Sequence, residues 1–145
     1  MPALSYKNAY IDLSESEASW RSRISCRTEL RRAARAPVRV SHLPGRPHGV
    51  IVACRAMLRS VLVAEYIRYD AGFDTLLVDP SFDLFVAYSG EVPCSFVLFD
   101  PRPLHSHFPG YMTAYLALSS NDARFRPMSP NYAALYTALS SFLAR

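Results

Sequence analysis

Two short runs of β-branched and aromatic residues, 84–88 and 95–99, flank a polar turn at 89–91. Runs of this length on either side of a glycine-containing turn predict a β-hairpin. Pro93 is expected at the start of the second strand or at a bulge, because proline has no N–H to donate to a central ladder. This hairpin is the clearest sheet element in the sequence.

Two stretches in the first half have helical periodicity. Ser14 and Glu17 form the S-x-x-E pattern of a capping box, which predicts a helix from about residue 15 to residue 36. The apolar stretch 50–71 is interrupted by charged residues, so it predicts a buried helix ended by Gly72 rather than a membrane span. A short strand at 38–40 and a turn at 43–49 are expected between these two helices.

The last 35 residues, 111–145, predict a strand, a polar loop rich in arginine and a closing helix. The strand is expected at 111–118, and Ser129 is the expected N-cap of the helix, with Pro130 in its first turn. The apolar face of the helix is expected to consist of Tyr132, Leu135, Tyr136, Leu139, Phe142 and Leu143. With a further short strand at 9–13, these elements indicate an α/β (α+β) fold.

Composition fits a single globular domain spanning residues 1–145, with half of the residues hydrophobic and 19% charged. The three cysteines have no paired spacing, which argues against a disulfide framework and against a metal site. The N-terminus lacks the charged and apolar pattern of a secretory signal. A cytoplasmic protein with reduced cysteines is therefore expected.

Positive charge is concentrated in one segment, where Arg23, Arg27, Arg31 and Arg35 recur every four residues. This spacing places the four side chains along one side of the predicted helix. Arginine binds phosphate oxygens bidentately, so the stripe is a candidate surface for RNA or another polyanion. The alternative is a solvated helix face whose arginines pair with nearby glutamates.

A second candidate anion site lies before the closing helix, at Arg124, Arg126, Ser129 and Asn131. Free main-chain N–H groups and the helix dipole favour an anion at a helix N-terminus. The alternative is that Ser129 acts only as a cap. His105 and His107 are expected to be surface histidines of a loop.

The order of the elements resembles a FemAB-type domain of the GNAT superfamily, which includes peptidoglycan-bridge aminoacyltransferases. Three segments carry the resemblance: residues 11–40 (IDLSESEASWRSRISCRTELRRAARAPVRV), the hairpin 83–99, and residues 117–145 with their strand–loop–helix pattern. The resemblance implies a mixed β-sheet flanked by helices. It also implies transfer of an acyl or aminoacyl group to an amine, with aminoacyl-tRNA or acyl-CoA as co-substrate and no tightly bound cofactor.

The chain departs from the family pattern in two ways. Residues 124–130 contain no glycine, although the pyrophosphate loop of the superfamily is glycine-rich, and this counts most against an acyl-CoA donor. The family also continues past the closing helix, so the GNAT-like sheet is expected to be incomplete at its C-terminal end. A second copy or a partner chain would then complete the open edge.

The sequence predicts that Arg124→Ala and Arg126→Ala each weaken donor binding. It does not assign a catalytic residue. Aminolysis needs a base or a positioning carboxylate, and Glu91, Asp100 and Asp122 all remain candidates. The alternative function is a non-catalytic interaction subunit that keeps a degenerate GNAT-like fold and binds a protein or RNA.

Overall fold

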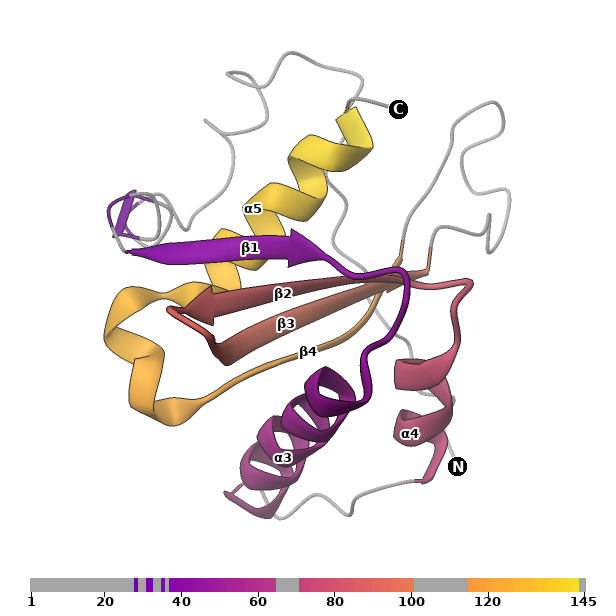
Figure 1. Cartoon of the computed structure of the whole chain (residues 1–145). Helices are drawn as coiled ribbons and strands as arrows, with labels where there is room; N and C mark the ends of the chain where they lie inside the picture. Colours follow the sequence, from indigo (N-terminus) through magenta and orange to yellow (C-terminus); the bar gives the residue numbers. More distant parts are fainter. Residues whose placement is uncertain are drawn as a thin grey trace, which may run out of the picture.

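The computed structural model describes residues 28, 31, 32, 35, 37–64, 71–100 and 115–143. In this part of the chain, four antiparallel strands form one open sheet in the order β1-β2-β3-β4, with helices on both faces (Figure 1). The strands are β1 (Val38–His42), β2 (Asp83–Ser89), β3 (Val92–Asp100) and β4 (Tyr115–Asn121). The helices are α3 (His48–Ala64), α4 (Ala71–Val78), the 3₁₀ helix η1 (Ala123–Met128) and α5 (Pro130–Leu143).

Strands β2 and β3 form the predicted hairpin, joined by Gly90 and Glu91. Gly90 has φ of 60°, a left-handed conformation that glycine adopts without steric cost. Ala87 pairs with Ser95 while Tyr88 pairs with Pro93, so Cys94 is the extra residue of a β-bulge. Pro93 therefore lies both near the start of its strand and beside a bulge, as the sequence predicted.

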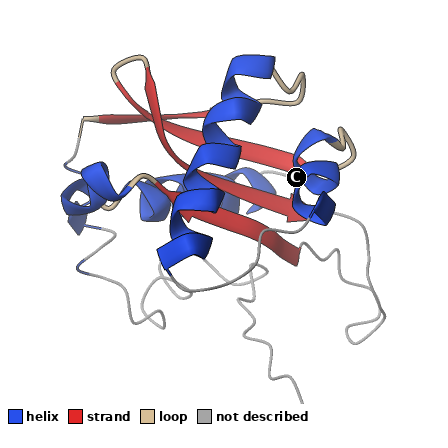
Figure 2. Cartoon of the chain, turned by 90° about the horizontal axis from the view of Figure 1, so that it is seen from below, coloured by secondary structure: helices blue, strands red, loops and turns tan. Residues whose placement is uncertain are grey.

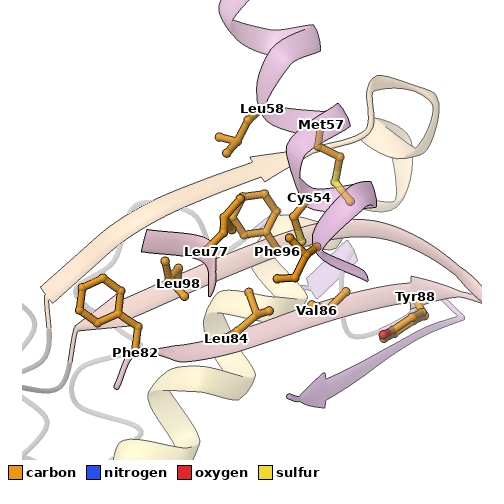
Figure 3. Packing of buried hydrophobic residues seen from close by; sticks show 11 residues of the cluster. Cys54, Met57, Leu58, Leu77, Phe82, Leu84, Val86, Tyr88, Phe96 and Leu98 are labelled. Carbon is orange, nitrogen blue, oxygen red and sulfur yellow. The ribbon is translucent and has the colours of Figure 1, made fainter. Parts of the chain in front are cut away.

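One face of the sheet is covered by α3 and α4, as the close view in Figure 3 shows. Alternate residues of the hairpin point to this face, because successive side chains of a strand point to opposite sides. Arg55 of α3 and Asp74 of α4 form an ion pair, with 2.5 Å between Nε and Oδ1. The buried residues of this cluster are Ile51, Cys54, Met57, Leu58, Leu77, Phe82, Leu84, Val86, Tyr88, Phe96 and Leu98.

The opposite face is covered by α5, which lies above the sheet in Figure 1. Figure 2 views the chain from below, with α3 and α4 in front of the strands and α5 behind them. The centre of the contact is formed by Ala134 and Ala138, both fully buried, whose small side chains let the helix approach the sheet closely. Near the end of the helix, the Phe142 ring meets the rings of Phe85 and Phe99 edge-on, at centroid distances of 6.1 and 5.1 Å. Such aromatic pairs stabilise the core beyond the area that they bury.

The structure confirms the α+β class with a helix-flanked sheet, the hairpin, and helices near residues 50 and 130. Two boundaries predicted from sequence are wrong. Gly72 does not end a helix; it is the second residue of α4. The predicted turn 43–49 is shorter, because α3 already begins at His48, directly after Pro47.

The C-terminal elements also differ in detail from the prediction. Strand β4 extends to Asn121, and the polar loop that follows it is the 3₁₀ helix η1. On α5, the apolar pattern selected tyrosines that are only half-buried and overlooked the two buried alanines.

Some predictions lie wholly or partly outside the described residues. The strand at 9–13 and the loop at 101–110 lie outside them. Of the predicted helix 15–36, only Thr28, Arg31, Arg32 and Arg35 are described, and all four are helical. Among the helices that the structure describes, none combines the length and hydrophobicity needed to cross a membrane.

Candidate functional site

The first candidate site is the turn that carries the chain from β4 into α5. Asp122 begins it: its main-chain N–H donates to the carbonyl of Cys94 at 2.8 Å, which fixes the turn to the bulge of β3. Its carboxylate accepts a hydrogen bond from the Arg124 N–H at 3.0 Å and so caps η1. An aspartate in extended backbone conformation is a favoured N-cap, which explains why η1 begins here.

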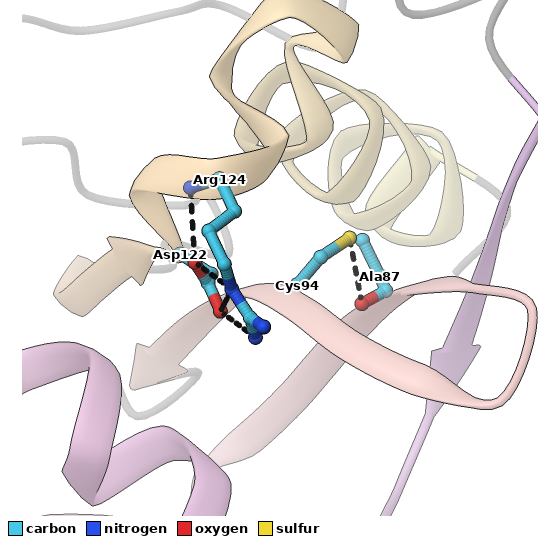
Figure 4. A network of polar contacts seen from close by, with 4 residues as sticks. All are labelled: Ala87, Cys94, Asp122 and Arg124. Carbon is cyan, nitrogen blue, oxygen red and sulfur yellow. Dashed lines mark hydrogen bonds and ion pairs between the residues drawn. The ribbon is translucent and has the colours of Figure 1, made fainter.

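The Asp122 carboxylate also binds the side chain of Arg124 (Figure 4). The Arg124 Nε lies 3.1 Å from each carboxylate oxygen, and Nη2 lies 2.7 Å from Oδ2. The hydrogen bond from Arg124 is the main cause that lowers the pKa of Asp122, and it raises the pKa of Arg124 in turn. A ligand anion would therefore compete with Asp122 for the guanidinium of Arg124.

Replacing Asp122 with asparagine is expected to lower stability at neutral pH by up to about 1 kcal/mol, since the charged part of the cap is lost. The pKa of Asp122 lies below its ordinary 3.8 in the folded protein. As the pH falls, Asp122 is therefore protonated in the unfolded chain before it is protonated in the folded protein. The stabilisation by the charged carboxylate is complete well above pH 3.8 and is lost as the pH falls through the pKa of Asp122 in the folded protein.

Urea unfolding of the wild type and Asp122→Asn between pH 3 and pH 7 checks this prediction. The stability difference between the two proteins should shrink toward pH 3. A difference that stays constant over the whole range would show that the charge of Asp122 does not stabilise the fold.

The other predicted residues of this site lie on the same turn. Arg126 is exposed, and its carbonyl accepts a hydrogen bond from the Ser129 N–H at 3.0 Å. Ser129 is buried and directly precedes α5, but its dihedrals, φ 49° and ψ 51°, are left-handed rather than the extended ones usual for an N-cap. The carbonyl of Ser129 accepts from the N–H groups of Tyr132 and Ala133 at 3.1 and 3.4 Å.

Two hydrogen-bond donors at this turn take no part in the hydrogen bonds described above: the main-chain N–H of Asn131 and the guanidinium of Arg126. Pro130 has no N–H, so Asn131 supplies the remaining main-chain donor of the first turn of α5. Arg126 supplies an exposed guanidinium close to it in sequence. The four predicted residues are close together in sequence and all lie on this turn or in the first turn of α5, and Arg124 is paired with the carboxylate of Asp122.

The arginine stripe is only partly described. Arg31 and Arg35 are exposed and helical, which agrees with a surface position, whereas Arg23 and Arg27 lie outside the described residues. Arg39 of β1 is also exposed, and its guanidinium stacks over the Tyr88 ring at 4.4 Å.

The carboxylates proposed for the chemistry are dispersed. Asp100 is buried at the end of β3, Glu91 is exposed in the hairpin turn, and Asp122 is paired with Arg124. His105 and His107 lie outside the described residues.

The two described cysteines, Cys54 and Cys94, are free and buried. Burial raises the pKa of Cys54 to about 12, and burial also raises that of Cys94, whose Sγ lies 3.4 Å from the carbonyl oxygen of Ala87 (Figure 4). Thiols with raised pKa are poor nucleophiles, and both cysteines are part of the buried core. No group of three potential metal ligands occurs among the described residues.

The structure reveals one histidine–carboxylate pair that the sequence analysis did not find. His42, the last residue of β1, pairs in register with Phe85, and Asp83 lies two residues earlier on β2. The His42 Nε2 is 2.9 Å from the Asp83 Oδ1. These residues are 41 positions apart, and no local pattern marks them, so only the strand register reveals the pair.

Comparison with protein-family models, with curated proteins and with solved structures finds no match to this chain. Its function must therefore be argued from its own residues.

Proposed function

We propose that the chain is an acyl- or aminoacyltransferase-like domain, which transfers an activated acyl group from a phosphate-bearing donor to an amine. One observation carries the proposal. The three segments that resemble FemAB-type domains meet in a single sheet: the first ends within β1, the second forms the β2–β3 hairpin, and the third includes most of β4 and the whole of α5. Segments far apart in the sequence thus form one continuous unit.

The donor is proposed to bind at the turn before α5. Aminoacyl-tRNA and acyl-CoA both carry phosphates, which suit an exposed arginine and a main-chain N–H at a helix N-terminus. Arg126 and Asn131 provide these two donors. Arg124 contributes less, because its guanidinium is already bound to Asp122.

Arg126→Ala is expected to weaken donor binding about tenfold, which corresponds to one charge-assisted hydrogen bond of about 1.5 kcal/mol. The measurement is a fluorescence-anisotropy titration of labelled acyl-CoA and of labelled aminoacyl-tRNA. Binding should also weaken as salt increases, since phosphate contacts release counterions.

Arg124→Ala is the matched control, because it removes an equally exposed arginine two residues away. Its effect on affinity is expected to stay within about threefold, since this side chain is engaged by Asp122. Equal losses of donor affinity in both variants would contradict the assignment of the donor site to Arg126. No loss of affinity in either variant would show that the donor does not bind at this turn.

A second candidate function is a non-catalytic interaction subunit. The observation that favours it is the open sheet: among the described strands, β1 and β4 each pair along one side only. An open edge can accept a strand from a partner or a second copy, and the exposed Arg31 and Arg35 can contact RNA. This candidate function predicts that the chain binds RNA or a protein but does not bind acyl-CoA or use aminoacyl-tRNA as an acyl donor.

A further inference from the structure

We infer that His42, oriented by Asp83, is the general base that takes the proton from the attacking amine; this inference rests on the proposed transfer function. The pair lies on the α5 face of the sheet at the edge strand β1. Its side chains are 37% exposed for His42 and 14% exposed for Asp83. The imidazole is therefore accessible from solvent, while its carboxylate partner is largely enclosed.

Two contacts fix the imidazole. One side of the ring stacks on Phe85, with the centroids 4.7 Å apart and the planes 17° from parallel. The edge of the ring is held by Asp83 through Nε2. Phe85 in turn forms a T-shaped contact with the Phe142 ring of α5. A histidine oriented by a carboxylate is the base-and-orienter half of a nucleophilic catalytic arrangement.

The hydrogen bond also determines which ring nitrogen can act. An ionised carboxylate only accepts hydrogen bonds, so the Nε2 of His42 carries the ring proton in the pair with Asp83. In neutral histidine the other nitrogen, Nδ1, then holds a lone pair. Nδ1 is the atom that accepts a proton.

The step balances with the two substrates of the proposed function. The amine nitrogen attacks the acyl carbon and forms the new C–N bond, while Nδ1 of His42 takes one proton from that nitrogen. The bond from the acyl carbon to the oxygen of the tRNA, or to the sulfur of CoA, breaks. The imidazolium then returns the proton to the leaving oxygen or sulfur.

The base lies at the opposite end of α5 from the proposed phosphate site. Asn131 lies in the first turn of the helix and Phe142 is near its end, a separation of about 16 Å along the axis at 1.5 Å per residue. Aminoacyl-tRNA and acyl-CoA are extended donors whose phosphates and acyl groups lie apart. One donor can therefore contact both ends of this face.

The test uses p-nitrophenyl acetate as acyl donor and hydroxylamine as amine, so it does not depend on phosphate binding. The wild-type chain is expected to form acetohydroxamate about 10²-fold faster than His42→Gln, the lower range for a positioned base. His48→Gln, which removes an exposed histidine at the start of α3, is the matched control and should keep the wild-type rate. Equal rates in the two variants would overturn the inference.

Added imidazole distinguishes a catalytic role of His42 from a structural one. Free imidazole should restore activity to His42→Ala if the ring acts as a base, but not if the side chain only supports the fold. A second measurement needs no variant: ¹⁵N NMR of the wild type should show neutral His42 as the Nε2–H tautomer. Asp83→Asn should populate both tautomers. A dominant Nδ1–H tautomer in the wild type would overturn the inference.

The two hypotheses can fail separately. If acyl-CoA and aminoacyl-tRNA do not bind but hydroxamate formation depends on His42, the donor class is wrong and the base stands. If a donor binds through Arg126 but His42→Gln keeps the wild-type rate, the base is wrong and the donor site stands.

Discussion

Replacing Phe85 with alanine is expected to lower the free energy of unfolding by about 3–5 kcal/mol. Phe85 is 1% exposed, lies in the middle of β2 and meets Phe142 of α5 edge-on. Its removal leaves a cavity between sheet and helix that neither rigid element can close. Because small domains are stable by only about 5–15 kcal/mol, this single change removes a large part of the total.

The measurement is urea unfolding followed by circular dichroism. Val52→Ala is the control, since Val52 is 48% exposed on α3 and its truncation should change stability by no more than about 0.5 kcal/mol. A loss below about 1 kcal/mol in Phe85→Ala would contradict the packing of α5 on this face. Phe85→Ala should also loosen His42, which stacks on the ring.

Arg46→Ala is expected to lower the free energy of unfolding by about 2 kcal/mol, because Arg46 joins two segments of the fold through three main-chain carbonyls. Its guanidinium donates to Leu43 at 2.5 Å, to Asp79 at 3.0 Å and to Phe82. These contacts connect the end of β1 to the segment between α4 and β2. Removing the guanidinium leaves three partly buried carbonyl oxygens without this donor.

Arg46→Gly separates the hydrogen bonds from the backbone conformation. Arg46 has φ of 51°, which costs a residue with a side chain about 1 kcal/mol relative to glycine. Arg46→Gly should therefore be more stable than Arg46→Ala by about that amount, while both remain less stable than the wild type in thermal unfolding. If Arg46→Ala unfolds at the wild-type temperature, the guanidinium does not stabilise this junction.

The elements that the sequence predicted well are those whose signals are local. The hairpin has two β-rich runs around Gly90, and the closing helix has Pro130 in its first turn, so both were located closely. The Gly72 prediction failed because a glycine near a helix boundary can lie on either side of it, and only the packing of α4 decides. The buried Ala134 and Ala138 were missed because alanine carries little hydrophobic signal of its own.

The candidate site shows the same division. Arg126 and Asn131 were found because they lie close in sequence to the start of the predicted closing helix, which Pro130 marks. The pairing of Arg124 with Asp122 depends on the rotamers of the 3₁₀ turn, which sequence spacing does not specify. The His42–Asp83 pair depends on the register between β1 and β2, and that register is set by tertiary packing.

The most direct test of the transferase proposal is transfer of a radiolabelled acyl group from aminoacyl-tRNA or acyl-CoA to hydroxylamine in the presence of the purified chain. The proposal predicts labelled hydroxamate from at least one donor, at a rate that rises in proportion to protein concentration. No transfer above the protein-free rate with either donor would contradict it and would favour the interaction subunit.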